Sequence, residues 1–248
     1  MSFGHVAIEM VTVSLPIVLG WVVSRLGLMS EGFERELSKL VLDVALPALV
    51  VSSVFGATKL PGAGELLQVF FGMMAFFVLA FIVACALCAV MRVPKTSLSS
   101  FRFIIMFGNC GFIGFPVITA ILGKRALLYA TIGLIPSNLF IFTLGIMMFR
   151  GMDGGWKAVC RGLLDCLKMP TLIASFIVIV CMATGFTNWG FVGDSIELVG
   201  QMTTPSALLL MGASIAHYQP LSMLTNWRAY VAAAGRLVLV PLAGMVML

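Results

Sequence analysis

A long apolar segment, Phe101 to Leu122, is interrupted by Gly108-Asn109-Cys110-Gly111-Phe112-Ile113-Gly114-Phe115-Pro116. Glycine weakens a helix, and Pro116 has no N–H and clashes with the carbonyl one turn earlier. Lipid offers no hydrogen-bond partners, so backbone groups that a break frees must be satisfied by protein, water or a ligand. Broken helices at membrane depth are typical of the binding sites of secondary transporters. We therefore expect a functional break here; the alternative is a proline kink that serves only packing.

The composition is that of a polytopic membrane protein. Of the 248 residues 61% are apolar and 10% charged, and the mean hydropathy is +1.12. A spanning helix needs about 20 mostly apolar residues. Eight segments are candidates: Val6–Leu28, Leu37–Phe55, Leu67–Met91, Phe101–Leu122, Ala126–Phe149, Thr171–Phe186, Ile196–Ala216 and Ala229–Leu248. The sixth is short, and the polar run from Gly200 to Thr204 leaves the start of the seventh uncertain. The predicted fold class is all-α.

Basic residues are distributed unequally among the loops. Those that follow the odd-numbered spans are Arg25, Arg35, Lys39, Arg92, Lys95, Arg102, Arg150, Lys157, Arg161, Lys168 and Arg228. Those that follow the even-numbered spans are only Lys59, Lys124 and Arg125. Because cytoplasmic loops are enriched in Lys and Arg, the odd loops are expected in the cytoplasm and the N-terminus outside. The net charge of +5 therefore indicates membrane topology and not nucleic-acid binding.

Two parts of the chain resemble each other. The stretch Leu37–Val51 matches Ser195–Leu209, and their prolines, Pro47 and Pro205, occupy the same place in each. An odd number of helices per copy inserts the second copy in the opposite sense, which is a common plan in secondary transporters. The repeat predicts a first five-helix copy over residues 1–150, a basic cytoplasmic loop over 151–169 and an incomplete second copy over 170–248.

The partner of the broken fourth span would lie beyond Leu248, so two spans are expected to be missing from the second copy. The chain is then a fragment, a truncated gene product or a natural short form. Half of a two-sided site is absent in that case, and we expect that residues 1–248 alone do not transport in liposomes. A chain extended by two spans would do so.

Four stretches together resemble the auxin efflux carrier family: Leu40–Leu49, Gly108–Pro116, Pro205–Ser214 and Gly235–Pro241. The resemblance implies ten helices in two inverted five-helix repeats, as in sodium–proton antiporters and bile-acid symporters. The fourth helix of each repeat would be broken, and the two breaks would cross at the substrate site. Spans one, two, six and seven would form a scaffold, and the others a moving transport domain. Bacterial members are permeases for small organic acids.

The break supplies the candidate substrate-binding residues Asn109, Gly111, Gly114 and Pro116. The Asn109 amide offers donors and an acceptor to a carboxylate or a coupling ion; the alternative is an internal hydrogen bond that braces the break. The glycines allow close approach, or equally serve helix packing. N–H groups at the start of the second half-helix, near Phe115, favour an anion.

Three further residues are candidates for coupling or for support of the site. Asp43 lies one turn before Pro47, where a carboxylate is costly unless paired, hydrated or protonated; it either couples transport to H⁺ or Na⁺ or pairs with Lys39 near the headgroups. Related sequences often have Asn at this position, which leaves the coupling ion open. Asn138 follows a second proline kink. Arg236, in span eight, either snorkels outward or attracts an anionic substrate.

No catalytic, metal or phosphate-binding motif is present in the sequence, and no cofactor is expected. The leading hypothesis is a secondary active transporter of the inner membrane that moves a small organic anion, such as a mono- or dicarboxylate, by alternating access. The alternative is a non-transporting membrane sensor or an inactive truncated remnant. The expected partners are the bilayer and the anion, and formation of a homodimer is left open.

The distribution of basic residues predicts that the loop from Arg150 to Lys168 is cytoplasmic. A single cysteine introduced at Lys157, in a chain without other cysteines, should stay unlabelled when intact cells are treated with an impermeant maleimide. It should become labelled once the membrane is permeabilised. Labelling from outside intact cells would show that this loop is external and that the predicted topology is wrong.

Overall fold

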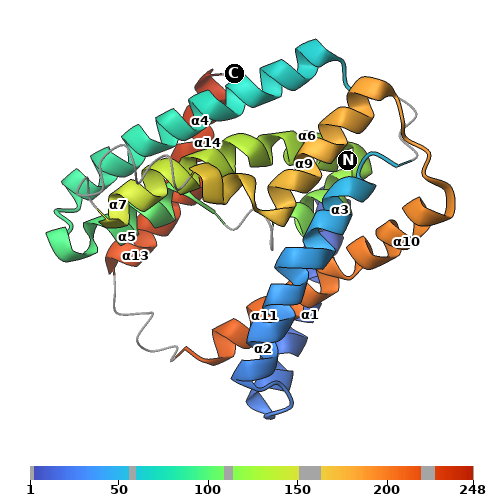
Figure 1. Cartoon of the computed structure of the whole chain (residues 1–248). Coiled ribbons are helices and arrows are strands. Elements are labelled where there is room, and N and C mark those ends of the chain that lie inside the picture. The colour runs from blue at the N-terminus through green and yellow to red at the C-terminus, as the bar shows by residue number, and fades with distance from the viewer. Residues whose placement is uncertain (1–2, 56–59, 109–113, 151–162, 219–226, 248) are drawn as a thin grey trace. The chain divides into compact units, whose positions relative to one another are not determined.

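The structure is a computed structural model that describes residues 3–55, 60–108, 114–150, 163–218 and 227–247. All regular elements in these ranges are helices (Figure 1), which confirms the all-α class. Four helices are long and apolar enough to cross a membrane: Ala63–Val90, Arg125–Phe149, Gly190–Ala216 and Trp227–Met245. Two further apolar helices, Met10–Arg25 and Pro170–Thr184, are shorter.

Helices occupy all eight segments that the sequence predicts. They are α1 (Phe3–Arg25); α2 (Glu31–Leu40), which continues through η1 (Val41–Ala45) into α3 (Leu46–Ser52); α4 (Ala63–Val90); α5 (Lys95–Met106); α6 (Phe115–Phe140), which continues through η3 (Ile141–Gly145) into α7 (Ile146–Arg150); α9 (Pro170–Thr184); α10 (Gly190–Gln201); α11 (Thr203–Ala216); and α13 (Trp227–Ala234), η4 (Gly235–Leu239) and α14 (Val240–Met247).

Several boundaries differ from expectation. The seventh segment is helical from Gly190 and not from Ile196, and only Met202 separates α10 from α11. Gly200 has no side chain and lies against the backbone of Leu49 in α3, so helix packing outweighs the polar character of this run. The predicted loop after Leu122 is instead a bend within α6, where Gly123 has φ 77° and ψ −179°, a conformation open to glycine.

The helices divide into two compact units, each built from separate stretches of chain. Unit 1 contains residues 1–63, 109–132 and 169–219, and unit 2 contains residues 64–108, 133–168 and 220–248. Unit 1 thus groups spans one, two, six and seven, as the family resemblance implies for a scaffold. Residues 109–132 depart from this expectation: they belong to unit 1, whereas the resemblance places them in the transport domain. The repeat boundaries at 150 and 170 stay a prediction.

Unit 1 is held together by direct backbone contact between helices. Gly20 of α1 lies against the backbone of Leu209, and Gly212 of α11 lies against the carbonyl of Ile17. A residue further along α11 contacts one earlier in α1, so the two helices are antiparallel here. Small residues at such crossings let membrane helices approach closely and gain dispersion energy, since lipid supplies little hydrophobic drive for association.

Unit 2 is held together by large side chains. Phe77 and Ala80 of α4 pack with Ile105 and Met106 of α5, and Val240 of α14 belongs to the same buried cluster. The ring of Phe77 stacks on Phe140 and also lies 5.7 Å from Phe107 between centroids. This aromatic contact fixes the end of α5 against α4 and α6.

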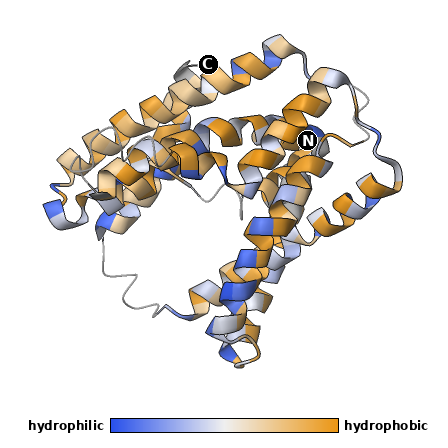
Figure 2. Ribbon diagram, viewed as in Figure 1, coloured by the Kyte–Doolittle hydropathy of each residue, from blue (hydrophilic) through white to orange (hydrophobic). Residues whose placement is uncertain are grey.

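The second span combines a polar half with an apolar half (Figure 2). Ser30 caps α2 and accepts a hydrogen bond from the N–H of Phe33 at 3.2 Å, and Glu31 and Glu34 occupy the first turn, where the helix dipole favours acids. The apolar half, α3, is almost entirely buried against α9 and α10. Span two therefore begins earlier than Leu37, at Glu31.

Widened π-helical turns precede two of the prolines. The N–H of Leu46, just before Pro47, donates to the carbonyl of Val41, and the N–H of Val240, just before Pro241, donates to that of Gly235. A proline leaves a carbonyl in the preceding turn without its donor, and single π turns of this kind are frequent at functional sites. At both places the backbone therefore departs from α-helical geometry within an otherwise regular span.

The described cysteines act as packing residues. Cys85, Cys88, Cys166 and Cys181 are free thiols, and all except Cys85 are buried. Burial raises the pKa of the Cys166 thiol, which lies between spans five and six, so this group stays protonated at neutral pH. Cys85 and Cys88 are three positions apart, but the described residues contain no cluster of three metal-ligating side chains that could hold a metal ion with them.

The contact between α1 and α11 predicts a large effect of one methyl group. Gly212→Ala would place Cβ on the backbone carbonyl of Ile17, so we expect a loss of about 1–3 kcal/mol from overpacking. Gly32→Ala in α2 is the matched control, because only the Ser30 hydroxyl lies near the new Cβ, at 3.9 Å. Thermal unfolding in detergent, followed by circular dichroism, measures both. Equal midpoints for the two variants would contradict the backbone contact.

Candidate functional site

The fourth span is interrupted where the sequence predicts it. The first half-helix, α5, ends at Met106; Phe107 is extended, with φ −109° and ψ 128°, and the second half-helix, α6, begins at Phe115. Asn109 and Gly111 lie outside the described residues. Gly114 directly precedes α6, and Pro116 is its second residue, where a missing N–H costs nothing. The described residues on both sides therefore exclude a continuous helix.

The end of α5 is capped by a side chain from span eight. The N–H of Phe107 satisfies the carbonyl of Phe103 at 2.8 Å. Nη1 of Arg236 donates to the carbonyl of Met106 at 2.6 Å and approaches that of Ile105 at 3.4 Å. The guanidinium is half-buried and directed into unit 2. The guanidinium reaches backbone carbonyls of α5, and the choice between the two roles expected for Arg236 stays a prediction.

Gly108 makes room for this guanidinium. A Cβ at position 108 would lie 2.7 Å from Nη2 of Arg236, which is closer than ordinary van der Waals contact. Gly108, the first residue of the stretch from Gly108 to Pro116, therefore leaves space for the guanidinium in addition to giving backbone freedom. Sequence reasoning found Gly108 and Arg236 separately but had no signal that joined them.

Asn138 lies past the end of α5, on the neighbouring fifth span. The hydroxyl of Ser99 donates to the carbonyl of Met148, and the ring of Phe103 lies against Gly145, so the two spans are antiparallel. Continuing this register places Phe107 near Phe140, as their shared contact with Phe77 shows. Asn138 is two residues before Phe140 and so lies beyond Phe107.

The Asn138 amide is buried and incompletely satisfied. Its side chain is 7% exposed, and Nδ2 has no hydrogen-bond partner among the residues that the structure describes. An unpaired buried donor costs about 1–3 kcal/mol, and such groups need an explanation in a native protein. A ligand or ordered water that accepts from Nδ2 is the simplest one. The expected supporting role of Asn138 stays a prediction.

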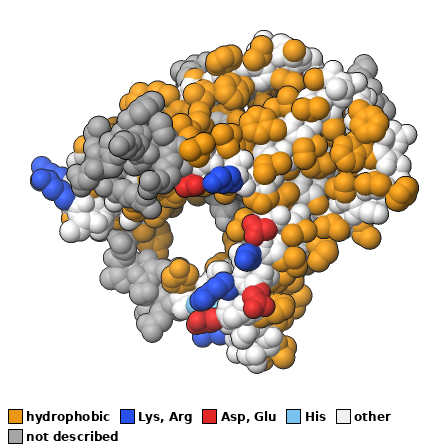
Figure 3. Space-filling model, viewed as in Figure 1, with side chains coloured by type: hydrophobic (Ala, Val, Ile, Leu, Met, Phe, Trp, Pro, Cys, Tyr) orange, Lys and Arg blue, Asp and Glu red, His pale blue; other side chains and the backbone are white. Residues whose placement is uncertain are grey.

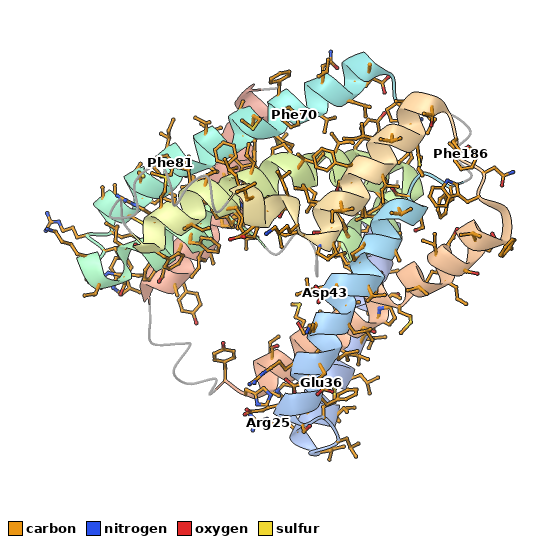
Figure 4. The ribbon with its side chains drawn as sticks, viewed as in Figure 1. Arg25, Glu36, Asp43, Phe70, Phe81 and Phe186 are labelled. Atoms are coloured by element: carbon orange, nitrogen blue, oxygen red, sulfur yellow. The ribbon has the colours of Figure 1, made fainter. Side chains whose placement is uncertain are left out.

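Asp43 is exposed on the π turn between α2 and α3 (Figure 4). It belongs to unit 1, whereas Arg236 and Asn138 belong to unit 2. Among the described residues the structure records no ion pair between Asp43 and Lys39. The headgroup pairing considered from sequence is therefore not seen, and a role in coupling stays a prediction.

A polar pocket lies between α2 and α11 in unit 1. Its volume is about 430 Å³, and it is lined by Glu31, Glu34, Arg35, Ser38, Ala207, Leu210, Met211, Ser214 and His217. Nε2 of His217 lies 3.0 Å from Oε2 of Glu34, and Oε1 of the same carboxylate accepts a hydrogen bond from the hydroxyl of Ser24. Charged side chains are prominent around this end of α2 in a surface that is otherwise largely hydrophobic (Figure 3). The sequence analysis had no signal that joined His217 to Glu34.

An apolar groove lies between α4 and α14 in unit 2. It measures about 590 Å³ and is lined by Leu79, Val83, Ala86, Leu87, Val90, Leu239, Leu242 and Ala243. Such a lining has no group that reads a carboxylate. The end of α5, where the charge of Arg236 meets the interrupted backbone, therefore remains the candidate anion site in unit 2.

Comparison with known proteins adds two findings. A family model described as "Membrane transport protein" matches residues 5–161 and 162–248. An uncharacterized transporter of Methanocaldococcus jannaschii is 24% identical over 228 residues, which cover 85% of this chain and 70% of that protein. The ranges matched by the family model include the interrupted fourth span and the span that contains Arg236.

The unpaired amide predicts an unusual response to mutation. Asn138→Leu removes a buried donor that has no partner, so in the absence of ligand the free energy of unfolding should be unchanged or rise by about 1 kcal/mol. Thr131→Val is the control on the same helix, because the buried Thr131 hydroxyl donates to the carbonyl of Leu127 at 2.9 Å. The control should lose about 0.5–1 kcal/mol. A larger loss for Asn138→Leu would show that Nδ2 is satisfied in the folded protein.

Proposed function

Because the chain belongs to the membrane transport protein family, we propose that it is a secondary transporter that moves a small organic anion, such as a mono- or dicarboxylate, across the inner membrane by alternating access. The single observation that carries the choice of an anion is the break in the fourth span. The first half-helix ends at carbonyls that the guanidinium of Arg236 caps, and the second half-helix, α6, begins after the interruption in the sequence.

Each edge of the break has a physical reason to tolerate negative charge. The first turn of α6 presents N–H groups that have no partner within the helix, and its dipole favours an anion. At the other edge Arg236 supplies a permanent positive charge, since a guanidinium does not lose its proton in proteins. We propose Asn109, Gly111, Gly114 and Pro116 as the substrate-binding stretch, with the Asn138 amide as a further donor to the carboxylate.

Alternating access requires two bodies that move relative to each other. We assign the scaffold to unit 1 and the moving part to unit 2, because Arg236, Asn138 and the end of the first half-helix all belong to unit 2. Coupling is assigned to Asp43, an exposed carboxylate beside a π turn in a span that is otherwise apolar at this depth. Protonation or binding of Na⁺ would remove the cost of its charge in the membrane.

Uptake measurements test the proposal. The native gene product, reconstituted in liposomes, should show saturable counterflow of one or more ¹⁴C-labelled mono- or dicarboxylates. Asn109→Ala should reduce that counterflow about tenfold or more, the equivalent of one lost hydrogen bond to a charged group. Binding of carboxylates without any counterflow would contradict transport and favour the sensor hypothesis.

The coupling assignment has its own variant pair. Asp43→Asn should abolish accumulation driven by an H⁺ or Na⁺ gradient but leave counterflow, because exchange of substrate needs no net movement of the ion. Glu36→Gln, on the same span and also exposed, removes the same charge and should retain both activities (Figure 4). Gradient-driven accumulation by Asp43→Asn would assign coupling to another group.

A further inference from the structure

A half-buried arginine inside an apolar span needs an explanation, and Arg236 has a specific one. Charged residues at membrane depth are costly and normally pair with other charges, backbone carbonyls or water. The residues whose carbonyls receive its donor, Ile105 and Met106, are both 0% exposed. Water therefore does not replace the guanidinium there without a rearrangement, and loss of Arg236 would leave the last carbonyls of α5 buried and unsatisfied.

The same contact changes the electrostatics of the break. The C-terminal end of a helix carries roughly half a negative elementary charge, which repels an approaching anion. The guanidinium adds one positive charge within hydrogen-bond distance of that end. The guanidinium thus opposes the partial negative charge at the end of α5. Without Arg236, the end of α5 would keep that partial negative charge.

We propose that Arg236 is a positioning residue that fixes the end of the first half-helix and cancels its negative dipole, so that the break admits an anion. Gly108 belongs to the same device, because any side chain at 108 would displace the guanidinium. The electrostatic part of the proposal rests on the proposed function, whereas the capping part does not. Arg236 acts on the substrate through α5, which distinguishes this role from direct attraction of the anion.

The capping part is tested by hydrogen–deuterium exchange of the last turn of α5, residues 103–107, in the purified protein. Arg236→Gln should speed exchange there about tenfold or more, because a hydrogen bond from a charged donor is lost at a buried site. Arg228→Gln is the matched control: it lies in the same span, is also half-buried, and its guanidinium stacks over Trp227 at 5.4 Å. Unchanged exchange in Arg236→Gln, or an equal change in the control, would overturn the cap.

The electrostatic part is tested by separating affinity from turnover in counterflow. Arg236→Gln should raise the KM for the transported carboxylate about tenfold, with a smaller change in maximal rate. Arg236→Lys and Gly108→Ala retain the positive charge but disturb the contact of the guanidinium with the carbonyls of α5. Both should therefore speed hydrogen exchange in α5, and both should raise KM less than Arg236→Gln does. These two variants also decide the matter if Arg236→Gln does not fold. An equal rise in KM for all three variants would overturn the charge argument.

The proposed function and the proposed role of Arg236 can be rejected independently. Absence of carboxylate counterflow in the unaltered protein would overturn the proposed function, and the exchange measurement would still decide the cap. Normal counterflow with faster α5 exchange but unchanged KM in Arg236→Gln would retain the function and reject the electrostatic role of Arg236.

Discussion

A backbone carbonyl buried within a bilayer needs a hydrogen-bond donor, and interrupting a spanning helix creates several such carbonyls at once. In this protein the interruption follows Met106, and the donor comes from Arg236, more than a hundred residues away in the sequence. The charged side chain in an apolar span, the glycine at position 108 and the buried end of α5 are therefore parts of one arrangement. Each would be unfavourable without the others.

The two units are stabilised in different ways, and this difference suits different tasks. In unit 1, α1 and α11 touch through backbone at Gly20 and Gly212, a contact that leaves little freedom for sliding. In unit 2, the end of α5 is held by aromatic side chains and one guanidinium, which can repack. We therefore regard unit 1 as the stiffer frame and unit 2 as the place where a substrate changes local structure.

Much of the fold follows from apolar segments alone. The all-helical class was predicted correctly, because lipid allows only satisfied backbone, and four of the helices are long and apolar enough to cross a membrane. The break was predicted because Gly, Asn and Pro in such a segment conflict with a continuous helix. The start of the seventh span was predicted too late, since the packing of Gly200 on α3 is a tertiary contact that local polarity hides. The inverted repeat stays a prediction.

The candidate site was predictable only in part. The sequence identifies Arg236 as costly but does not say which way its side chain turns, because the choice between snorkelling and inward capping depends on the position of α5. The unpaired Nδ2 of Asn138 and the pair between His217 and Glu34 likewise depend on neighbours that are distant in sequence. The type of a residue shows that its polar group needs a partner, but only the fold shows which group that partner is.

The central claim is that the interruption of the fourth span is where the transported anion binds. Cys110 lies within that interruption, and replacing the other five cysteines leaves it as a single reporter. We expect the transported carboxylate to slow alkylation of Cys110 by a membrane-permeant maleimide, with half-protection at the concentration that half-saturates counterflow, whereas a carboxylate that is not transported leaves the rate unchanged. Equal alkylation rates with and without saturating transported substrate would contradict the claim and place the binding site elsewhere in the protein.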